Sequence, residues 1–450
     1  KNKGYITSQV YIKEQNINSG ILTFTANEGI VEEIKAKKII PFFISPLKRH
    51  KKLNIQDIDQ TTENLSQLAS YNYQTNIEPG STTGYSKINI TGTNTIPIHT
   101  TFEYDTLGQT YTGIERYSLS STIDNPLHIG DTLTLKYTTT NLFSSYQHSN
   151  AAIASWQFPL GSWNLSYNGS YSKYLTTVQA PSQSFQSYGN SFLQSFSLNK
   201  NIFRNKSIKT SLNSTLNTIN SNNYTSQAFS TQSRNLTNVE FSLSNNLYTP
   251  YGSFFHKFSY IQGINAFGAT ADPTNTTYHS EFNAIRFYHF YNITTNKIFN
   301  GNLPLNFQNT IDSQYSFQEL YSQNQFTLSG FYAVRGFRNS NIYGSSGILT
   351  RNDLNLPLQT YTNLPIIKNL TIGTFFDIGL AQSYFPTNIA NSTTTNNGTM
   401  AGTGYKISYN SKYLQSTLTI SYPITYPSNL SQNIQTHEPF TIYFNLKGVI

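Results

Sequence analysis

Alternation of apolar and polar residues, maintained from about residue 98 to the end of the chain, is the feature that most limits the folds open to this sequence. In residues 162–171, alternate positions carry Trp, Leu, Tyr and Tyr, while the positions between them carry Ser and Asn. The same pattern recurs in residues 132–138, 417–422 and 440–446. Because successive side chains of a β-strand point to opposite faces, the pattern predicts strands with one apolar and one polar face.

These strands could belong to a soluble β-sandwich or solenoid, since a half-buried sheet shows the same alternation. Two observations favour a membrane barrel. The polar face holds Ser, Thr, Asn and Gln with few charges, and aromatic residues often fall near segment ends, as in transmembrane barrels. An open sheet of this width would also leave unpaired edges, which closure removes. We therefore predict a mostly β fold, in which residues 96–450 form a transmembrane antiparallel β-barrel of about 16 strands.

Composition agrees with this class of protein. Only 37% of residues are hydrophobic and 11% are charged, which is unusual for a soluble globule, while 14% aromatic residues argue against disorder. No segment approaches the roughly 18 consecutive apolar residues of a membrane-spanning helix. The chain has no cysteine, as suits an exported bacterial protein. Its net charge of +8 is dispersed along the chain, so we predict no nucleic-acid partner.

Residues 1 to about 95 have a different sequence pattern, with most of the charge runs and the only convincing predicted helix. Asn54 can cap this helix, and Asp57 is placed to complete a capping box. The residues that would form its buried face are Ile55, Ile58, Leu65 and Leu68. A hairpin that turns at Pro79-Gly80 follows the helix. The pattern predicts a small α+β module ahead of the barrel.

Two shorter strands are predicted upstream, in residues 6–11 and 21–26, joined through residues 18–20. Two strands alone are only marginally stable. We therefore interpret residues 1–33 as the C-terminal part of a preceding module. An irregular N-terminal extension is the alternative.

A pair of motifs within the barrel region suggests a buried ion pair. The first is Val334-Arg335-Gly336-Phe337, and the second, some forty residues later, is Phe376-Asp377-Ile378-Gly379. An arginine in a Gly-flanked loop and a carboxylate inside a strand can form two parallel, charge-assisted hydrogen bonds. Alternatively, Arg335 is a solvated loop residue and Asp377 a lumen residue that never meet.

These motifs, together with residues 124–131 (DNPLHIGD) and 159–163 (PLGSW), resemble those of the outer-membrane transporters of two-partner secretion, the TpsB type or haemolysin secretion/activation family. The resemblance extends over essentially the whole chain. It implies that residues 1–33 end a first polypeptide-transport-associated (POTRA) domain and that residues 34–95 form a second. It also implies a sixteen-stranded barrel whose long sixth extracellular loop, about residues 318–347, folds back into the lumen and pairs with the barrel wall.

The resemblance further implies a function. A protein of this type lies in the bacterial outer membrane with its POTRA region in the periplasm, where it recognises a large exported partner and passes it, unfolded, to the cell surface or medium. The implied partner is a β-helical haemolysin, adhesin or contact-dependent toxin. The barrel would contact outer-membrane lipid, and the barrel-assembly machinery during biogenesis. The POTRA residues that bind the partner are not identified beyond the range 34–95.

Two alternatives to this function stay open. A barrel-assembly or insertase protein shares the POTRA domains and the Arg-Gly loop motif, but it usually carries a longer POTRA array. A general porin needs neither feature, so the predicted α+β module disfavours it.

Motifs for other chemistry are weak. The histidines are scattered without the close pairs typical of zinc sites, and the sequence has no nucleophile elbow or phosphate-binding glycine loop. We therefore predict no enzymatic activity, no cofactor and no metal site. Residues 344–347 are expected to be a flexible part of the long loop, and residues 391–397, rich in Asn, Ser and Thr, a long surface loop.

Overall fold

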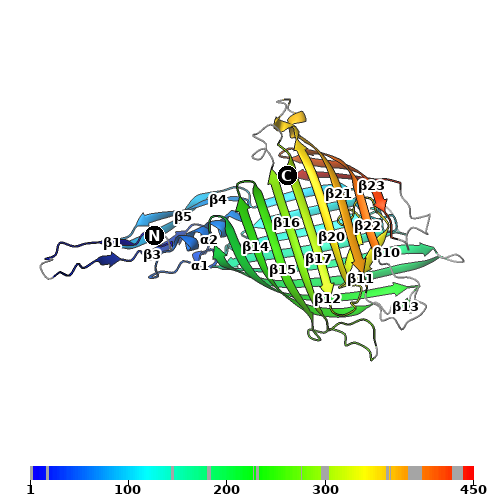
Figure 1. Ribbon diagram of the computed structural model, residues 1–450, viewed down its shortest axis with the longest axis horizontal. Coiled ribbons are helices and arrows are strands. Elements are labelled where there is room, and N and C mark those ends of the chain that lie inside the picture. The colour runs from blue at the N-terminus through cyan, green and yellow to red at the C-terminus, as the bar shows by residue number, and fades with distance from the viewer. Residues whose placement is uncertain are drawn as a thin grey trace.

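Sixteen antiparallel strands close into a barrel, and a smaller module extends from one of its ends (Figure 1). The structure is a computed structural model. It describes residues 4–16, 20–142, 146–179, 184–226, 228–229, 233–274, 276–294, 304–360, 364, 366–383, 398–427 and 439–449. The tract at residues 391–397 lies outside the described residues. Among the described residues, no helix has the length and apolar character needed to cross a membrane.

The barrel strands follow chain order, each paired with the next, and the last pairs with the first. They are β6 (Ile98–Asp105), β7 (Arg116–Asp124), β8 (Thr132–Thr140), β9 (His148–Leu160), β10 (Trp163–Gln179), β11 (Ser184–Arg204), β12 (Ile208–Thr225), β14 (Arg234–Thr249), β15 (Gly252–Gly263), β16 (Asn283–Thr294), β17 (Asn306–Ser316), β20 (Ser346–Pro357), β21 (Leu370–Gln382), β22 (Gly398–Asn410), β23 (Leu414–Thr425) and β24 (Thr441–Val449). A two-residue strand, β13 (Ala228–Phe229), pairs with the end of β12, and two short 3-10 helices, η2 (Leu358–Thr360) and η3 (Ile367–Asn369), lie between β20 and β21. The predicted mostly β fold with a barrel of about 16 strands is confirmed.

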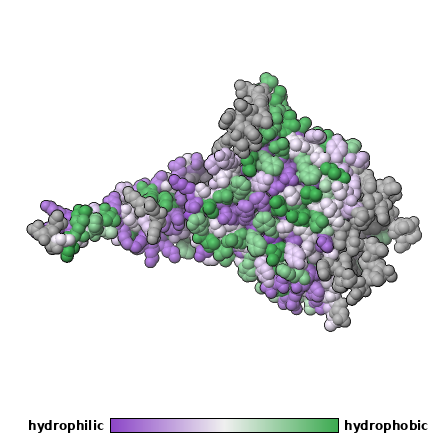
Figure 2. Space-filling view, in the orientation of Figure 1, coloured by the Kyte–Doolittle hydropathy of each residue, from purple (hydrophilic) through white to green (hydrophobic). Residues whose placement is uncertain are grey.

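The side chains alternate between the two faces of the barrel wall as the sequence pattern predicts. Along β21, Phe375 and Asp377 are buried on the inner face, whereas Phe376 and Ile378 are exposed on the outer face. Leu135 is likewise among the exposed apolar side chains. Hydrophobic residues are spread over the visible outer wall (Figure 2). The outer wall is therefore suited to lipid and the inner wall to polar contacts.

The N-terminal module is a three-stranded sheet with two helices. Its elements are β3 (Ile30–Ala36), α1 (Pro41–Ile44), α2 (Ile55–Ser66), β4 (Tyr71–Pro79) and β5 (Tyr85–Asn94). The strand order is β3-β5-β4, with β3 parallel to β5 and β4 antiparallel to it. Ahead of this sheet, β1 (Gln9–Tyr11) and β2 (Thr25–Asn27) form an antiparallel pair. Since β3 begins at Ile30, this sheet includes residues on both sides of the predicted boundary between residues 33 and 34.

Helix α2 forms where the sequence predicts it. The side chain of Asn54 caps it by accepting a hydrogen bond of 3.0 Å from the backbone N–H of Gln56. Ile58, Leu65 and Leu68 are buried against the sheet. The helical periodicity therefore identified the core face correctly.

The module is attached to the barrel by side chains at the ends of the barrel strands. The amide of Asn64 on α2 donates to the backbone oxygen of Gly161, and Glu63 forms ion pairs with Arg204 and Lys209. The buried carboxylate of Asp124 accepts two hydrogen bonds of 2.7 Å from Ser70, which precedes β4, one from its N–H and one from its hydroxyl. The sequences at 124–131 and 159–163 therefore lie at the junction between the module and the barrel.

A long loop between β17 and β20, residues 317–345, leaves the barrel end opposite the module and packs against the inner wall. It contains a hairpin of β18 (Phe326–Ser329) and β19 (Asn341–Gly344). The hairpin packs with wall residues Leu349, Ala381 and Met400 in one apolar cluster. The prediction that residues 344–347 are flexible loop is wrong, because Gly344 ends β19 and Ser346 begins β20.

Candidate functional site

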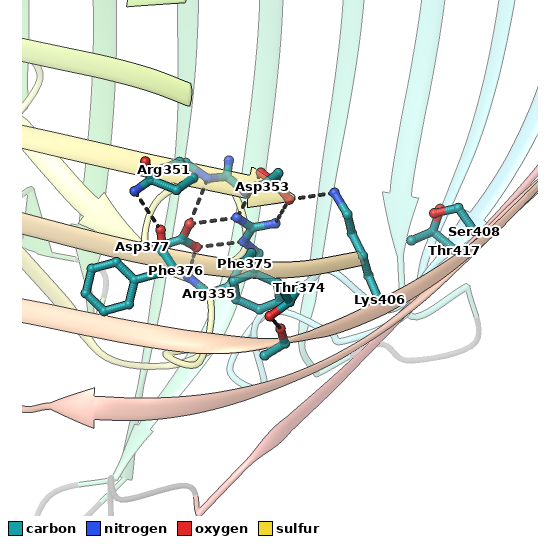
Figure 3. A network of polar contacts seen from close by, with 12 residues as sticks. Arg335, Arg351, Asp353, Thr374, Phe375, Phe376, Asp377, Lys406, Ser408 and Thr417 are labelled. Carbon is teal, nitrogen blue, oxygen red and sulfur yellow. Dashed lines mark hydrogen bonds and ion pairs between the residues drawn. The ribbon is translucent and has the colours of Figure 1, made fainter. Parts of the chain in front are cut away.

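The side chain of Arg335, at the tip of the long loop, contacts the inner wall of the barrel through Asp377 on β21 (Figure 3). Its Nε donates to Oδ2 of Asp377 and its Nη2 to Oδ1, both at 2.6 Å. The backbone N–H of Arg335 also donates to Oδ2, at 3.0 Å. Arg335 is 3% exposed and Asp377 is fully buried. Such a bidentate, desolvated pair has a defined geometry and fixes the loop at one point on the wall.

A second carboxylate binds the other side of the same guanidinium group. Nη1 and Nη2 of Arg335 donate to Asp353 on β20, at 2.9 and 3.1 Å. Asp353 also accepts from Nζ of Lys406 on β22. Nε of Arg351 lies 3.8 Å from Asp377, while its Nη1 donates to the backbone oxygen of Tyr332 in the loop. The cluster therefore contains two carboxylates and three cations, with Arg335 between the two carboxylates.

An aromatic ring completes the binding site for Arg335. The guanidinium carbon lies 3.7 Å from the centroid of the Phe375 ring on β21. A cation over the face of an aromatic ring is attracted electrostatically, and more strongly where water is excluded. Phe375 and Asp377 are two residues apart on one strand, so both point inward, one beneath the guanidinium group and one bonded to it.

Glycines allow the loop to approach the wall closely. Gly336 has φ = 112°, a conformation that residues with side chains rarely adopt. On the wall, a Cβ atom at Gly402 would lie 1.9 Å from the backbone oxygen of Arg335. A Cβ atom at Gly379 would lie 2.6 Å from a methyl group of Leu328 in the loop hairpin. The two wall glycines therefore leave the space that the loop occupies.

The apolar residues of the loop motif are buried beside Arg335. Val334 is 1% exposed and belongs to the apolar cluster between loop and wall. Phe337 is 2% exposed and makes an edge-to-face contact with Tyr426, at 5.0 Å between ring centroids. The motif thus anchors the loop through apolar packing as well as through charge.

The structure brings most of the predicted site residues together, but not all of them. Val334, Arg335, Gly336 and Phe337 lie at the loop tip, with Asp377 and Gly379 facing them from the wall. Phe376 is placed elsewhere: it is 42% exposed on the outer face, and Figure 3 shows its ring directed away from the network. Strand alternation explains this difference, because a neighbour of the inward Asp377 must point outward.

Sequence reasoning missed three residues of this site, namely Asp353, Gly402 and Lys406. Parity along the strands could have identified them. Asp353 and Lys406 are charged, and charged side chains in a membrane strand are expected on the lumen side. Gly402 and Gly404 occupy alternate positions of β22, as expected where another chain segment lies against the wall.

The arrangement is suited to holding a loop. Among the described residues, no group of three or more His, Cys, Asp or Glu side chains is arranged to bind a metal ion. What the geometry can do is keep the tip of the loop against the inner wall of the barrel for as long as its ion pairs hold.

Known proteins share both the sequence pattern and the fold. The outer membrane transporter CdiB of Dickeya dadantii (strain 3937) is 29% identical over 385 residues, covering 84% of this chain and 67% of that protein. The chain spans about two thirds of the length of the curated relatives it matches, from 61 to 67%.

Solved structures match the fold. The structure of CdiB from Escherichia coli is similar with a TM-score of 0.86 and 23% identity, covering 100% of this chain and 81% of that one. BamA from Haemophilus ducreyi, in a form lacking POTRA domains 1–3, matches less well, with a TM-score of 0.55 and 13% identity over 100% of this chain and 91% of that one.

The family model described as haemolysin secretion/activation protein ShlB/FhaC/HecB matches residues 84–409, which is more than half of the chain. The closed barrel and these relatives place the protein in the bacterial outer membrane. The chain therefore belongs to the haemolysin secretion/activation family, the two-partner secretion type that its motifs predict.

Proposed function

We propose that this protein is the translocator of a two-partner secretion system. It receives a large exported partner protein in the periplasm and passes it, unfolded, through the barrel to the cell surface or medium. The observation that carries this proposal is the ion-paired anchor of Arg335 on Asp377 and Asp353, which holds a long loop inside a closed barrel. A loop held by a few separable contacts can be displaced by a passing chain.

The polar inner wall supports passage of an unfolded chain. Between β11 and β12, the hydroxyl of Ser195 donates to the Asn217 side chain, and the hydroxyls of Ser197 and Thr215 share a hydrogen bond. Such groups offer weak, interchangeable hydrogen bonds and little apolar surface for a partner to adhere to. The chain would act without catalysing a reaction, and lipid and the barrel-assembly machinery would be its further contacts.

In this proposal, residues 1–33 are the end of a first POTRA domain and residues 34–95 form the second, with β3 crossing the boundary between them. Strand β4 is an edge of the module's sheet. The opposite edge, β3, is partly covered, since Val31 exchanges backbone hydrogen bonds with His50 and Lys51. We place partner binding at β4, because a free edge can take up an extended strand through main-chain hydrogen bonds.

Neighbouring prolines test this edge. Consecutive residues of an edge strand direct their N–H groups to opposite sides, so Thr75→Pro and Asn76→Pro affect different edges of β4. One removes a bond to β5 and weakens the sheet, and the other removes only a group available to a partner. The variant that loses only the outward N–H group should fold with an unchanged circular dichroism spectrum yet lose partner binding. Unchanged binding in both folded variants would exclude the β4 edge.

The direct test of the function is secretion. The full-length gene is expressed with the large exported protein encoded beside it, and that protein is assayed in the medium and on the cell surface. Its appearance outside the cell only when the transporter is present supports translocation. If it stays in the periplasm while deletion of the transporter depletes other outer-membrane barrels, an insertase function replaces this proposal.

A further inference from the structure

Within the part of the chain that the structure describes, the shortest ladder between the sixteen strands of the barrel is the seam where the first and last of them meet. Among the described residues, β6 and β24 share five residue pairs, from Thr101 with Val449 to Asp105 with Asn445. The adjacent pairings, β6 with β7 and β23 with β24, each have eight. Toward the end of the barrel that faces away from the module, the regular seam therefore stops after Asp105.

Where the seam pairing stops, a side chain of the loop forms hydrogen bonds to both sides of the seam. Arg338 lies three residues after Arg335 and is 7% exposed. Its Nη1 donates to the backbone oxygens of Thr106 and Gly108, which follow β6. Its Nη2 donates to the backbone oxygen of Ile442 on β24, at 2.6 Å. One guanidinium group thus binds both sides of the seam.

The surroundings of Arg338 make this contact specific. Its guanidinium carbon lies 4.7 Å from the centroid of the Tyr443 ring, and Tyr443 is 1% exposed. Phe331 from the loop makes an edge-to-face contact with the same ring, at 4.9 Å between centroids. A buried cation is costly unless its hydrogen bonds are satisfied, so Arg338 needs the three carbonyl groups as acceptors in order to stay buried.

Other loop residues bind the same region of the barrel. Asn339 accepts from the N–H and the hydroxyl of Thr110, at 3.1 and 2.9 Å. The hydroxyl of Tyr332 accepts from Arg116, which is itself bonded to Asp105 at the end of the seam ladder. These contacts attach the loop to the β6 side of the seam.

We propose that Arg338 holds the outer end of the β6–β24 seam closed, and that the seating of the loop through Arg335 controls this contact. Only Gly336 and Phe337 separate the two arginines, so withdrawal of Arg335 from Asp377 would draw Arg338 away from the seam. The barrel wall would then loosen when the loop leaves the lumen, which would widen the path at that moment. This inference concerns the barrel itself and does not depend on what passes through it.

Amide hydrogen exchange of the purified full chain in lipid nanodiscs tests the proposal. The reporters are the seam amides of Thr106 and Phe444, which bond across the seam to the Phe444 carbonyl and the Thr106 hydroxyl, both at 2.9 Å. In Arg338→Ala, both should exchange about tenfold faster or more than in the wild type. Arg335→Ala should produce the same change although its side chain does not touch the seam.

Arg286→Ala is the matched control. Arg286 on β16 is also a lumen arginine with a bidentate carboxylate partner, Asp312 on β17, but it lies far from the seam along the strand order. It should leave the seam amides unchanged. If Arg338→Ala does not assemble, Arg338→Lys replaces it, because an ammonium group keeps the charge but cannot span three carbonyls.

Three results would overturn the proposal. Wild-type exchange of the seam amides in the Arg338 variant would show that Arg338 does not hold the seam. An equal increase in Arg286→Ala would show general loosening of the barrel. Faster exchange of the seam amides in Arg338→Ala, with no change in Arg335→Ala, would show that the seating of the loop does not control the seam.

Discussion

Arg335 and Asp377 are joined by three hydrogen bonds, one of them from the backbone of Arg335, so the carboxylate fixes both the side chain and the main chain of the loop tip. Asp353 binds only the side chain. The two carboxylates are therefore not equivalent: loss of Asp377 releases the main chain of the loop, whereas loss of Asp353 removes one of two partners of the guanidinium group.

This difference predicts a ranking of secretion defects. Arg335→Ala leaves a fully buried Asp377 without its main partner, and removing one member of a buried pair costs about 3 to 5 kcal/mol. Arg335→Ala and Asp377→Ala should each lower secretion about tenfold or more, with the barrel still assembled, and Asp353→Ala should lower it less. The measurement is partner protein in the medium, with heat-modifiable gel migration as the assay of barrel assembly. Wild-type secretion in both strong variants would refute the role of the pair.

Gly402→Ala should reproduce the Arg335→Ala defect without changing any charge. The added methyl group would lie 1.9 Å from the backbone oxygen of Arg335, so loop or wall must move. Gly448→Ala on β24 is the control, since its nearest neighbour, a backbone oxygen of Phe102, is 4.0 Å away. Secretion should fall in the first variant and persist in the second. Equal secretion in both would mean that close contact of loop and wall at Gly402 is dispensable.

The barrel and the central ion pair of its site could be predicted from the sequence, but on grounds that differ between residues. Strand alternation and helical periodicity are local, so the barrel strands and the buried face of α2 could be predicted. Arg335 and Asp377 were found through a family resemblance. Asp353 was missed because its contact depends on the register of β20 with β21. This register pairs Arg351 with Asp377 and Asp353 with Phe375. Arg338 binds backbone carbonyls, for which no sequence signal exists.

Asp124 should control how firmly the module is attached to the barrel. Its carboxylate is 2% exposed and accepts two hydrogen bonds from Ser70. Asp124→Ala would leave the buried N–H of Ser70 without this acceptor, at a cost of about 1 to 3 kcal/mol. We expect faster proteolysis of the connection at residues 95–97 in the variant. Glu78→Ala, on the exposed part of β4, is the control and should be cleaved at the wild-type rate; an identical rate for Asp124→Ala would argue against this anchor.

Acid should loosen the turn between β4 and β5 through Glu32 on β3. The backbone N–H of Ser81 donates to this carboxylate at 2.6 Å, and that bond, assisted by Lys87, lowers the pKa of Glu32 below its ordinary value of 4.5. Because the folded pKa is lowered, the contribution of Glu32 to stability is fully present above pH 4.5 and is lost as the pH falls through the lowered pKa. The protection factor of the Ser81 amide, measured by hydrogen exchange, should therefore fall in that range. In Glu32→Gln it should be low already at neutral pH and nearly independent of pH; a wild-type protection profile in this variant would show that the carboxylate does not hold the turn.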